Sequence, residues 1–283
     1  MSRIIQLQDG TELPVIGQGT WWVGDNPNQR TQEIEALRRG IELGMKVLDT
    51  AEMYGDGLAE MVVGEAIADC RESVFLVSKV LPHHAAGLEL QQSLEQSLER
   101  LQTDYLDLYL LHWRGSIPLQ QTVDGLEQLR QSGVIRRWGV SNMDTCDMQD
   151  LLQCKGGEHC QVNQVLYHLA SRGVEFDLKP WLNEQHIPMM AYSPLAQAGR
   201  LHDELLASDI LRGIADELDA DPFQVMLAWS IRDGHTLAIP KSSNVSHVQR
   251  NIQAASLALS DTQLQQLDQV FVPPTHKMPL DII

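Results

Sequence analysis

Eight short apolar runs, each followed by a segment with helical periodicity, constrain this 283-residue sequence more than any other feature. Strands that alternate with helices in this way are typical of parallel βαβ units. Most runs recur at intervals of about 22 to 33 residues, the length that one strand, one crossover helix and two loops require. The pattern predicts one α/β domain over residues 1–283, a (β/α)8 TIM barrel with strands at 15–19, 46–49, 75–79, 106–112, 138–141, 161–164, 188–192 and 237–241.

The segments between the runs carry the apolar stripe of amphipathic helices. Leu90, Leu94, Leu98 and Leu101 follow one another at spacings of four, four and three, as residues on one face of a helix do. The interval between the last two runs is longer than the others. We expect a large loop and an additional helix there.

The two ends of the chain add elements to the barrel. Residues 4–7 and 12–15 flank the dipeptide Asp9-Gly10 and predict a β-hairpin that closes the N-terminal mouth of the barrel. Ser260 and Gln263 fit a capping box that begins a C-terminal helix. A short tail follows this helix.

The net charge of -17 at pH 7 argues against two large classes of partner. Nucleic acids and anionic membrane surfaces would both be repelled by a protein with this charge. No segment approaches the roughly 18 consecutive apolar residues of a membrane-spanning helix, and the N-terminal segment lacks the apolar stretch of a signal peptide. We therefore expect a cytoplasmic monomer that acts on a small molecule, without nucleic-acid or membrane partners.

The cysteines give no sign of a disulfide framework or a metal site. Four cysteines without a Cys-x-x-Cys pair are too few for a secreted disulfide scaffold, so we expect free thiols. Cys154, His159 and Cys160 are soft potential ligands, but they lie in a glycine-rich loop without a fourth partner at a recognisable spacing. We expect no bound metal.

Four polar residues follow successive strands: Asp49, Tyr54, Lys79 and His112. In a parallel barrel the loops after the strands converge, so these side chains should meet. Lys79 as an ammonium would favour the phenolate of Tyr54 and lower its pKa from near 10 toward neutrality, while Asp49 would keep Lys79 charged. Tyr54 would then give a proton to a developing alkoxide, and His112 would donate a hydrogen bond that orients a carbonyl.

Other interpretations of these residues stay open. Each residue alone fits a structural role, as half of an ion pair, a packing tyrosine or a core histidine. An aldolase-type enzyme would use Lys79 as a Schiff-base nucleophile, but that requires a neutral amine, and Asp49 is expected to keep Lys79 protonated. A Rossmann dinucleotide site is excluded, because Trp22 occupies the place of the third glycine after Gly17 and Gly19.

Four segments resemble the signature blocks of the aldo-keto reductases, in the same order along the chain. They are Leu-Asp-Thr-Ala-Glu-Met-Tyr-Gly at 48–55, Val-Ser-Lys at 77–79, Leu-Leu-His-Trp at 110–113 and Gly-Val-Ser-Asn at 139–142. The resemblance extends from Gly10 through Asn251. It implies a barrel that binds NADPH and passes a hydride to an aldehyde or ketone, with Tyr54 as proton donor. A cofactor-sensing protein of the same superfamily with little turnover is an alternative, and the intact four-residue set argues against it.

The same resemblance implies how the nicotinamide end of the cofactor is held. Side chains that both donate and accept hydrogen bonds would hold the carboxamide, an aromatic ring would stack on the nicotinamide, and small residues would let the cofactor approach the first strand. The implied residues are Gly19, Thr20, Trp21 and Asp49 near the first two strands, Ser141, Asn142, Gln164 and Tyr192 around the nicotinamide, and Ser193, Leu195, Gln197 and Gly199 along the pyrophosphate.

The adenosine end carries one departure from the family. The residues implied around the 2′-phosphate and the adenine are Lys241, Ser242, Asn244 and Asn251. His247 stands where the family usually has arginine, and a histidine with a pKa near 6.5 carries only a fractional charge at pH 7. Arg250 lies nearby in the sequence and is an alternative source of positive charge, although helical spacing is expected to turn it away from the side of His247. We therefore expect NADPH as the cofactor, with weaker discrimination against NADH.

The rim of the barrel mouth is expected to be aromatic and mostly apolar. The segment after His112 and the tail after Phe271 are both short, so a deep, steroid-sized pocket is not expected. The overall pattern is similar to prokaryotic aldo-keto reductases that reduce methylglyoxal and related 2-oxoaldehydes, which favours small aldehydes and dicarbonyls as substrates. The rim candidates are Trp21, Trp22, Met53, Tyr54, His83, His112 and Trp113.

Overall fold

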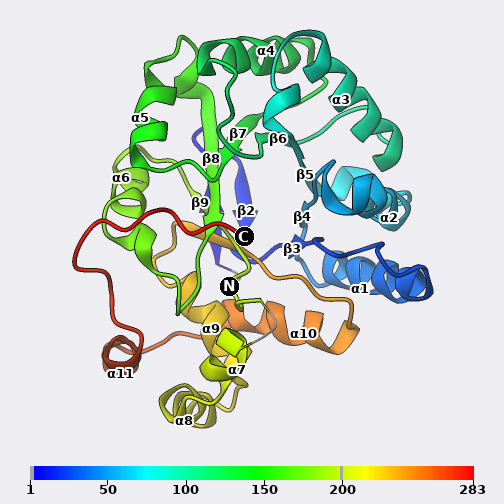
Figure 1. Cartoon of the computed structure of the whole chain (residues 1–283). Coiled ribbons are helices and arrows are strands. Elements are labelled where there is room, and N and C mark those ends of the chain that lie inside the picture. Colours follow the sequence, from blue (N-terminus) through cyan, green and yellow to red (C-terminus); the bar gives the residue numbers. More distant parts are fainter. Residues whose placement is uncertain (1–2, 198–199) are drawn as a thin grey trace.

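The computed structural model describes residues 3–197 and 200–283, and its centre is a barrel of parallel strands (Figure 1). The edge strands meet through hydrogen bonds from Gly17 N–H to Ala238 O (2.8 Å) and from Gly19 N–H to Pro240 O (3.2 Å), so the sheet closes on itself. The predicted (β/α)8 barrel is confirmed. Its strands, in spatial order, are β3 (Gln18–Gly19), β4 (Val47–Asp49), β5 (Phe75–Val80), β6 (Leu108–Leu111), β7 (Trp138–Ser141), β8 (Cys160–Leu166), β9 (Met189–Tyr192) and β10 (Thr236–Ile239).

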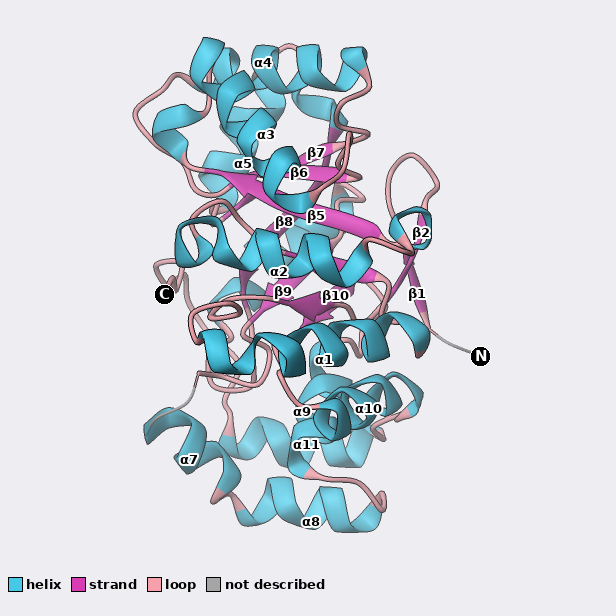
Figure 2. Ribbon diagram, turned by 90° about the vertical axis from the view of Figure 1, so that its right-hand side faces the viewer, coloured by secondary structure: helices cyan, strands magenta, loops and turns pink. Residues whose placement is uncertain are grey.

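Helices surround the barrel and connect its strands (Figures 1 and 2). The helices that follow successive strands are α1 (Arg30–Glu42), α2 (Leu58–Ile67), α3 (Gly87–Leu101), α4 (Leu119–Ser132), α5 (Thr145–Gln153), α6 (Leu178–Glu184), α9 (Pro222–Ser230) and α10 (Val245–Gln253). The long interval after β9 holds two additional helices, α7 (Arg200–Leu206) and α8 (Asp209–Glu217), where one was expected. After the barrel, Ser260 and Gln263 form the predicted capping box of α11 (Asp261–Val270).

The predicted N-terminal hairpin is present. It consists of β1 (Ile4–Gln6) and β2 (Glu12–Pro14), with Ile5 opposite Leu13. Both of these side chains are buried in the same apolar cluster as the barrel interior. The hairpin therefore closes one end of the barrel, and the C-terminus lies at the other end (Figure 2).

Strand alternation decides which side chains reach the open end of the barrel. On β4, Val47 packs in the interior cluster and Leu48 packs in the outer cluster, between the sheet and the helices. Asp49 is the next interior position, because side chains on a strand alternate with a period of two. The same period places other polar side chains at the interior ends of their strands: Lys79, His112, Ser141, Gln164 and Tyr192.

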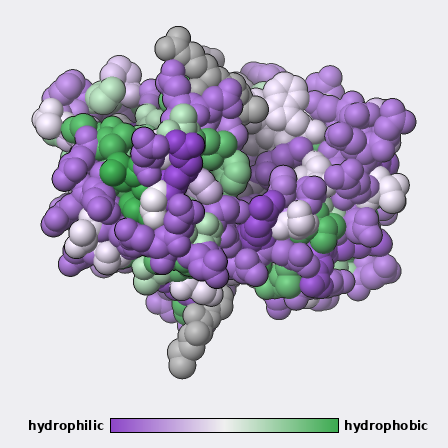
Figure 3. Space-filling view, turned by 90° about the horizontal axis from the view of Figure 1, so that it is seen from below, coloured by the Kyte–Doolittle hydropathy of each residue, from purple (hydrophilic) through white to green (hydrophobic). Residues whose placement is uncertain are grey.

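The surface carries mostly hydrophilic residues on the face shown in Figure 3, with small and separate hydrophobic patches. In the part of the chain that the structure describes, no helix is long and apolar enough to span a membrane. Within the same part, no three or more His, Cys, Asp or Glu side chains are grouped so that they could hold a metal ion. In the loop at 154–160, His159 lies 3.1 Å from Glu127 instead.

Close packing of the first strand segment against β4 generates a testable prediction at Gly17. A Cβ atom at this position would lie 2.8 Å from the carbonyl oxygen and 2.9 Å from the Cβ of Val47. Gly17→Ala is therefore expected to lower the free energy of unfolding by about 1–3 kcal/mol, because the backbone must move to relieve the contact. Urea unfolding measures this change.

Gly213, in the middle of α8, provides the matched control. An added Cβ there meets no described atom within 4 Å. Gly213→Ala is expected to raise the free energy of unfolding by about 0.5–1 kcal/mol, since alanine loses less conformational freedom in a helix. Unchanged stability of Gly17→Ala beside a stabilised Gly213→Ala would contradict the close approach of residue 17 to Val47 on β4.

Candidate active site

The ammonium group of Lys79 is the centre of the candidate site. Lys79 is fully buried at the end of β5, and its Nζ donates hydrogen bonds to Asp49 Oδ2 (2.7 Å), to the carbonyl oxygen of Thr50 (2.8 Å) and to the Tyr54 hydroxyl (3.0 Å). These three acceptors use all three hydrogens of the ammonium. The ring of His112 meets that of Tyr54 edge-on, with centroids 5.8 Å apart. The structure thus brings together the four residues that the sequence indicated.

The loop that carries Tyr54 is anchored by Glu52, which the sequence analysis missed. Glu52 Oε1 accepts a hydrogen bond from the backbone N–H of Leu81 (2.7 Å) and lies 3.2 Å from His84 Nδ1, while Oε2 accepts from the Ser93 hydroxyl. These contacts tie the loop after β4 to the segment just beyond β5. The sequence signal for a role of Glu52 is its position between Asp49 and Tyr54, two expected site residues.

Burial sets the direction of the pKa shift at Tyr54 and His112, whereas the neighbouring charge of Asp49 reverses its effect at Lys79. Burial raises the pKa of Tyr54 above its ordinary value of 10, and the charge of Lys79 opposes this only in part. The expectation of a lowered Tyr54 pKa is wrong. Burial destabilises the phenolate by more free energy than the nearby ammonium of Lys79 provides in stabilisation. Burial acts to lower the pKa of Lys79, but the charge of Asp49 and the hydrogen bonds raise it overall. Burial, with the charge of Lys79, lowers the pKa of His112 to about 3, so this imidazole is neutral at pH 7.

The hydroxyl proton of Tyr54 is available to a molecule outside the cluster. The phenol oxygen accepts a hydrogen bond from Lys79, so the phenol hydrogen must point in another direction. No acceptor for this hydrogen occurs among residues 3–197 and 200–283. Tyr54 also lines an open groove, which gives its proton a route to a ligand.

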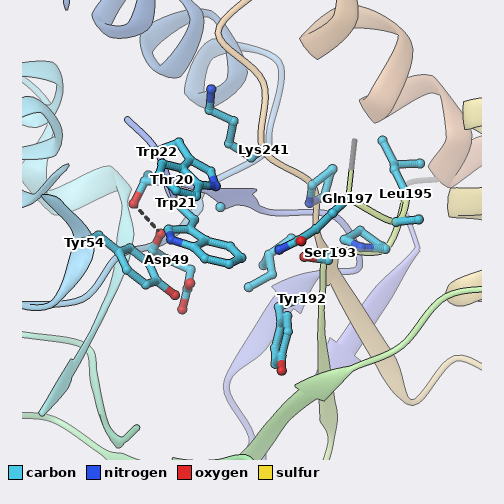
Figure 4. Close-up of a pocket in the computed structure, with 15 residues that line it drawn as sticks. Thr20, Trp21, Trp22, Asp49, Tyr54, Tyr192, Ser193, Leu195, Gln197 and Lys241 are labelled. Carbon is cyan, nitrogen blue, oxygen red and sulfur yellow. Dashed lines mark hydrogen bonds between the residues drawn. The ribbon is translucent and has the colours of Figure 1, made fainter. Parts of the chain in front are cut away.

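This groove has a volume of about 470 Å³ and runs away from Tyr54 along the barrel mouth (Figure 4). Thr20 lies at its base and donates a hydrogen bond to the backbone oxygen of Asp49 (2.9 Å). The groove adjoins a second pocket of about 350 Å³, with which it shares Leu195, Ala196 and Lys241. The residues that line it are Gly19, Thr20, Trp21, Trp22, Asp49, Tyr54, Tyr192, Ser193, Pro194, Leu195, Ala196, Gln197, Ile239, Pro240 and Lys241.

The polar residues expected around the nicotinamide form one hydrogen-bonded chain. Gln164 Nε2 donates to Asp49 Oδ1 (2.7 Å), and the Ser141 hydroxyl donates to the backbone oxygen of Gln164 (2.8 Å). The Tyr192 hydroxyl donates to Asn142 Oδ1 (2.9 Å). Ser141 and Gln164 are buried beneath the groove, and Tyr192 lines it. The chain joins this set to the carboxylate that also binds Lys79.

Gly19, Thr20 and Trp21 line the groove as expected, but the reason for glycine at position 19 is different. A Cβ atom there would lie 2.7 Å from the carbonyl oxygen of Ile239. The close approach of β3 and β10 therefore requires glycine, whatever lies in the groove. Thr20 is fully buried and serves Asp49 through its hydroxyl.

The loop after β9 forms the wall opposite Tyr54. Ser193, Leu195 and Gln197, the residues expected along the pyrophosphate, all line the groove. Ser193 and Ala196 have positive φ angles of 47° and 60°, which bend the backbone sharply around the groove. Gly199, also expected here, lies outside the described residues.

The predicted aromatic rim is a continuous run of five rings. The centroid distances along the run are 5.4 Å from Trp22 to Trp21, 6.4 Å from Trp21 to Tyr54, 5.8 Å from Tyr54 to His112 and 4.9 Å from His112 to Trp113. Trp22 is the outermost ring, 61% exposed. Two further rim candidates, Met53 and His83, lie exposed on the loops after β4 and β5.

The C-terminal tail also reaches the barrel mouth, which the sequence did not indicate (Figure 1). Lys277 donates to both carboxylate oxygens of Asp177 (2.9 and 2.8 Å), and the Ser171 hydroxyl donates to Asp281 (2.5 Å). Burial raises the pKa of Tyr192, and the backbone of Ile283, at the end of the tail, acts in the opposite direction. The polar side chains of the tail in these contacts, Lys277 and Asp281, do not stand out in the sequence.

The second pocket collects four of the five residues expected around the 2′-phosphate and the adenine, with two differences: Arg250 lines it and Asn244 does not. Arg250 lines it together with His247, so the expectation that Arg250 points away is wrong. Residues three positions apart on a helix lie on the same side. Asn244 instead caps α10 by accepting from the Ser246 backbone N–H (2.8 Å). The full lining is Leu195, Ala196, His202, Asp221, Phe223, Lys241, Ser242, His247, Arg250 and Asn251.

The fold and the site define a carbonyl-reducing class of barrel enzyme, and comparison with known proteins agrees. The model of the aldo/keto reductase family matches residues 15–271. The chain therefore belongs to the aldo/keto reductase family.

Particular relatives are close over their whole length. The chain is 51% identical to methylglyoxal reductase YeaE of Escherichia coli, over 99% of both chains, and 34% identical to glyoxal reductase of Bacillus subtilis, over 93% of this chain and 91% of the relative. An aldo/keto reductase from Klebsiella pneumoniae, solved in complex with NADP and acetate, superimposes with a TM-score of 0.98 at 51% identity and covers 100% of both chains. An aldo-keto reductase from the same organism was solved in complex with NADPH, again at 51% identity with a TM-score of 0.98.

The buried ion pair generates a stability prediction. Lys79→Met leaves the Asp49 carboxylate buried without its cation, so the free energy of unfolding is expected to fall by about 3–5 kcal/mol. The double variant Lys79→Met/Asp49→Asn is expected to regain most of this loss, because no charge then lacks a partner. Urea unfolding measures both.

Arg39→Met is the matched control, because it breaks the exposed pair between Arg39 and Glu42 (2.8 Å). Its effect is expected to stay below about 1 kcal/mol. Equal losses for Lys79→Met and for the double variant would show that the carboxylate does not depend on the ammonium.

Proposed function

We propose that this chain is an NADPH-dependent carbonyl reductase that converts small aldehydes, 2-oxoaldehydes such as methylglyoxal, and some ketones to alcohols. The contact between Lys79 and Tyr54 carries the proposal. It turns the Tyr54 proton toward the groove and places a cation beside the oxygen that loses it. The raised pKa of Lys79 disfavours the alternative in which this residue attacks a substrate as a neutral amine.

The groove and the second pocket together fit a phosphorylated dinucleotide. They form one continuous path from Tyr54 to a cluster of basic side chains, Lys241, His247 and Arg250. The bound, reduced nicotinamide supplies the hydride. The residues that we propose to bind this cofactor are Gly19, Thr20, Trp21, Asp49, Ser141, Asn142, Gln164, Tyr192, Ser193, Leu195, Gln197, Lys241, Ser242, Asn244, His247 and Asn251.

The chemistry that we assign to the protein is proton donation to a carbonyl oxygen. A substrate oxygen between the Tyr54 hydroxyl and the neutral imidazole of His112 accepts a hydrogen bond from each. As negative charge develops on this oxygen, the Tyr54 proton moves to it. The ammonium of Lys79, 3.0 Å away, stabilises the phenolate that remains, and Asp49 keeps the ammonium in place.

The proposed substrates follow from the shape of the mouth and from the relatives. Trp21, Trp22, Tyr54, His112 and Trp113 form the aromatic rim, which favours a small and largely uncharged substrate. The relatives from E. coli and B. subtilis are named for methylglyoxal and glyoxal. A panel of aldehydes and ketones with NADPH and NADH tests this proposal, and no turnover of 2-oxoaldehydes would contradict it.

We further propose that the chain works as a single-domain monomer in the cytoplasm. Both apolar clusters are completed by elements of one barrel, which supports one folding unit. Cys70, Cys146, Cys154 and Cys160 are free thiols, which suits a reducing compartment. Size-exclusion chromatography with light scattering tests the monomer.

Tyr54→Phe tests the proton donor directly. The variant is expected to retain NADPH binding, seen as a change in the fluorescence of nearby Trp21, and to lose carbonyl reduction by a factor of about 10² to 10⁴ in kcat. Tyr105→Phe is the control, since Tyr105 packs against Arg71 on the outside of the barrel and is expected to leave kcat unchanged. Full activity of Tyr54→Phe would remove Tyr54 as the donor.

The ionisation states of the site predict a flat pH profile. Reduction needs the neutral phenol of Tyr54, which persists up to its raised pKa and is lost above it. His112, with its pKa lowered to about 3, remains neutral over the same range. We therefore expect kcat for reduction to show no ionisation between roughly pH 5 and pH 8. A limb near pH 6.5 would mean that His112 titrates during turnover.

A further inference from the structure

The second pocket contains two permanently charged basic residues in addition to His247. Lys241, His247 and Arg250 all line it, in a chain whose net charge is -17. Lys241 Nζ donates to the Ser243 hydroxyl (2.8 Å), so it is held close to the pocket wall. The other permanently charged group is Arg250, a planar fork that matches two phosphate oxygens at once.

Asp221 forms an ion pair with Arg250 and also caps the N-terminus of α9. Asp221 Oδ1 accepts a hydrogen bond from the Gln224 backbone N–H (2.9 Å) and caps α9, while Oδ2 lies 3.3 Å from Arg250 Nη1. Gln224 Nε2 also donates to the backbone oxygen of Arg250 (3.1 Å). The backbone of Arg250 is therefore fixed to α9, whereas its guanidinium group has one long ion-pair contact among residues 3–197 and 200–283.

This contact is weak enough to be exchanged. The side chain of Arg250 is 46% exposed and that of Asp221 is 23% exposed. Ion pairs between groups this accessible to water contribute little stability. A phosphate on the ribose carries more charge than one carboxylate and offers the guanidinium two acceptors, so it competes successfully for Arg250.

We propose that Arg250 is the permanent cation that binds the ribose 2′-phosphate of NADPH, and that Asp221 is the counter-ion it leaves on binding. This inference rests on the proposed function and names the residues that set its cofactor preference. With NADH, which lacks the phosphate, Arg250 stays paired with Asp221. The acid thus weakens the attraction for the phosphate without affecting the rest of the cofactor.

The adenine base has a different surface in the same pocket. The rings of Phe223 and His202 lie against each other with centroids 5.6 Å apart and planes inclined by 30°. Aromatic faces of this kind suit a planar base. Arg250 is therefore not needed to stack on the adenine, and its guanidinium group can bind the phosphate.

The test is a pair of substitutions read by binding rather than by turnover. Arg250→Gln is expected to weaken the Kd for NADPH by about 10- to 100-fold and to change the Kd for NADH by less than about twofold. Asp221→Asn is expected to tighten NADPH by about 3- to 10-fold with little change for NADH. Asparagine caps helices as well as aspartate does, so α9 is preserved. Tryptophan-fluorescence titration measures each Kd.

Two comparisons make the test specific. In the double variant Arg250→Gln/Asp221→Asn, the tightening caused by Asp221→Asn is expected to be smaller than in the unchanged protein, because the cation that it frees is absent. Arg212→Gln is the matched control: Arg212 also pairs with an aspartate, Asp209 (2.7 Å), but lines neither pocket. Its NADPH affinity is expected to stay unchanged.

The outcomes separate this inference from the proposed function. Equal losses of NADPH and NADH affinity in Arg250→Gln would show that Arg250 contacts a part common to both cofactors, and would overturn the inference. Unchanged NADPH affinity in Arg250→Gln would do the same, while carbonyl reduction by the unchanged protein would leave the proposed function standing. Failure of the unchanged protein to bind NADPH would instead remove the proposed function. Circular dichroism and thermal unfolding check that each variant is folded.

Discussion

The buried ammonium of Lys79 is the interaction on which the rest of the site depends. A charge without contact to water is tolerated only where fixed acceptors surround it, and here a carboxylate, a backbone carbonyl and a phenol oxygen do so. This requirement holds β4, β5 and the loop that follows β4 together. It also orients the Tyr54 proton outward and helps keep His112 neutral. The same hydrogen bonds of Lys79 therefore stabilise the fold and prepare Tyr54 for proton donation.

Sequence patterns predicted the parts of this arrangement that depend on local periodicity. Asp49, Lys79 and His112 continue the interior rows of their strands, so their convergence follows from the period of two and from the parallel order. The raised pKa of Tyr54 was not predictable, because it depends on how completely the folded barrel excludes water. Helical spacing was enough to place Arg250 on the same face of α10 as His247, and the expectation of the opposite face was an error. The ion pair of Arg250 with Asp221 joins two helices, so it could be found only in the structure.

Backbone strain gathers at the open end of the barrel. Five of the eight non-glycine residues with positive φ among those described lie on loops around the mouth, at Trp22, Asp56, Asn142, Ser193 and Ala196. Such conformations cost energy and persist where surrounding contacts impose them, which is common at functional sites. Trp22 is the clearest case, because a bulky side chain is held at a φ of 67° and remains largely exposed against Trp21. The rim is therefore shaped by the fold before any ligand binds.

The two ends of the long groove work by different physics and lie on different elements. At one end, β4 to β6 hold a buried cluster in which burial and the charge contact between Lys79 and Asp49 decide the protonation states. At the other, α9 and α10 present exposed charges, which water and salt screen and which exchange partners readily. Among the described residues, only Leu195, Ala196 and Lys241 line both regions. Substitutions of Asp221 or Arg250 can therefore change the choice of cofactor without disturbing Tyr54. In the described parts of the chain, neither residue contacts the cluster around Lys79.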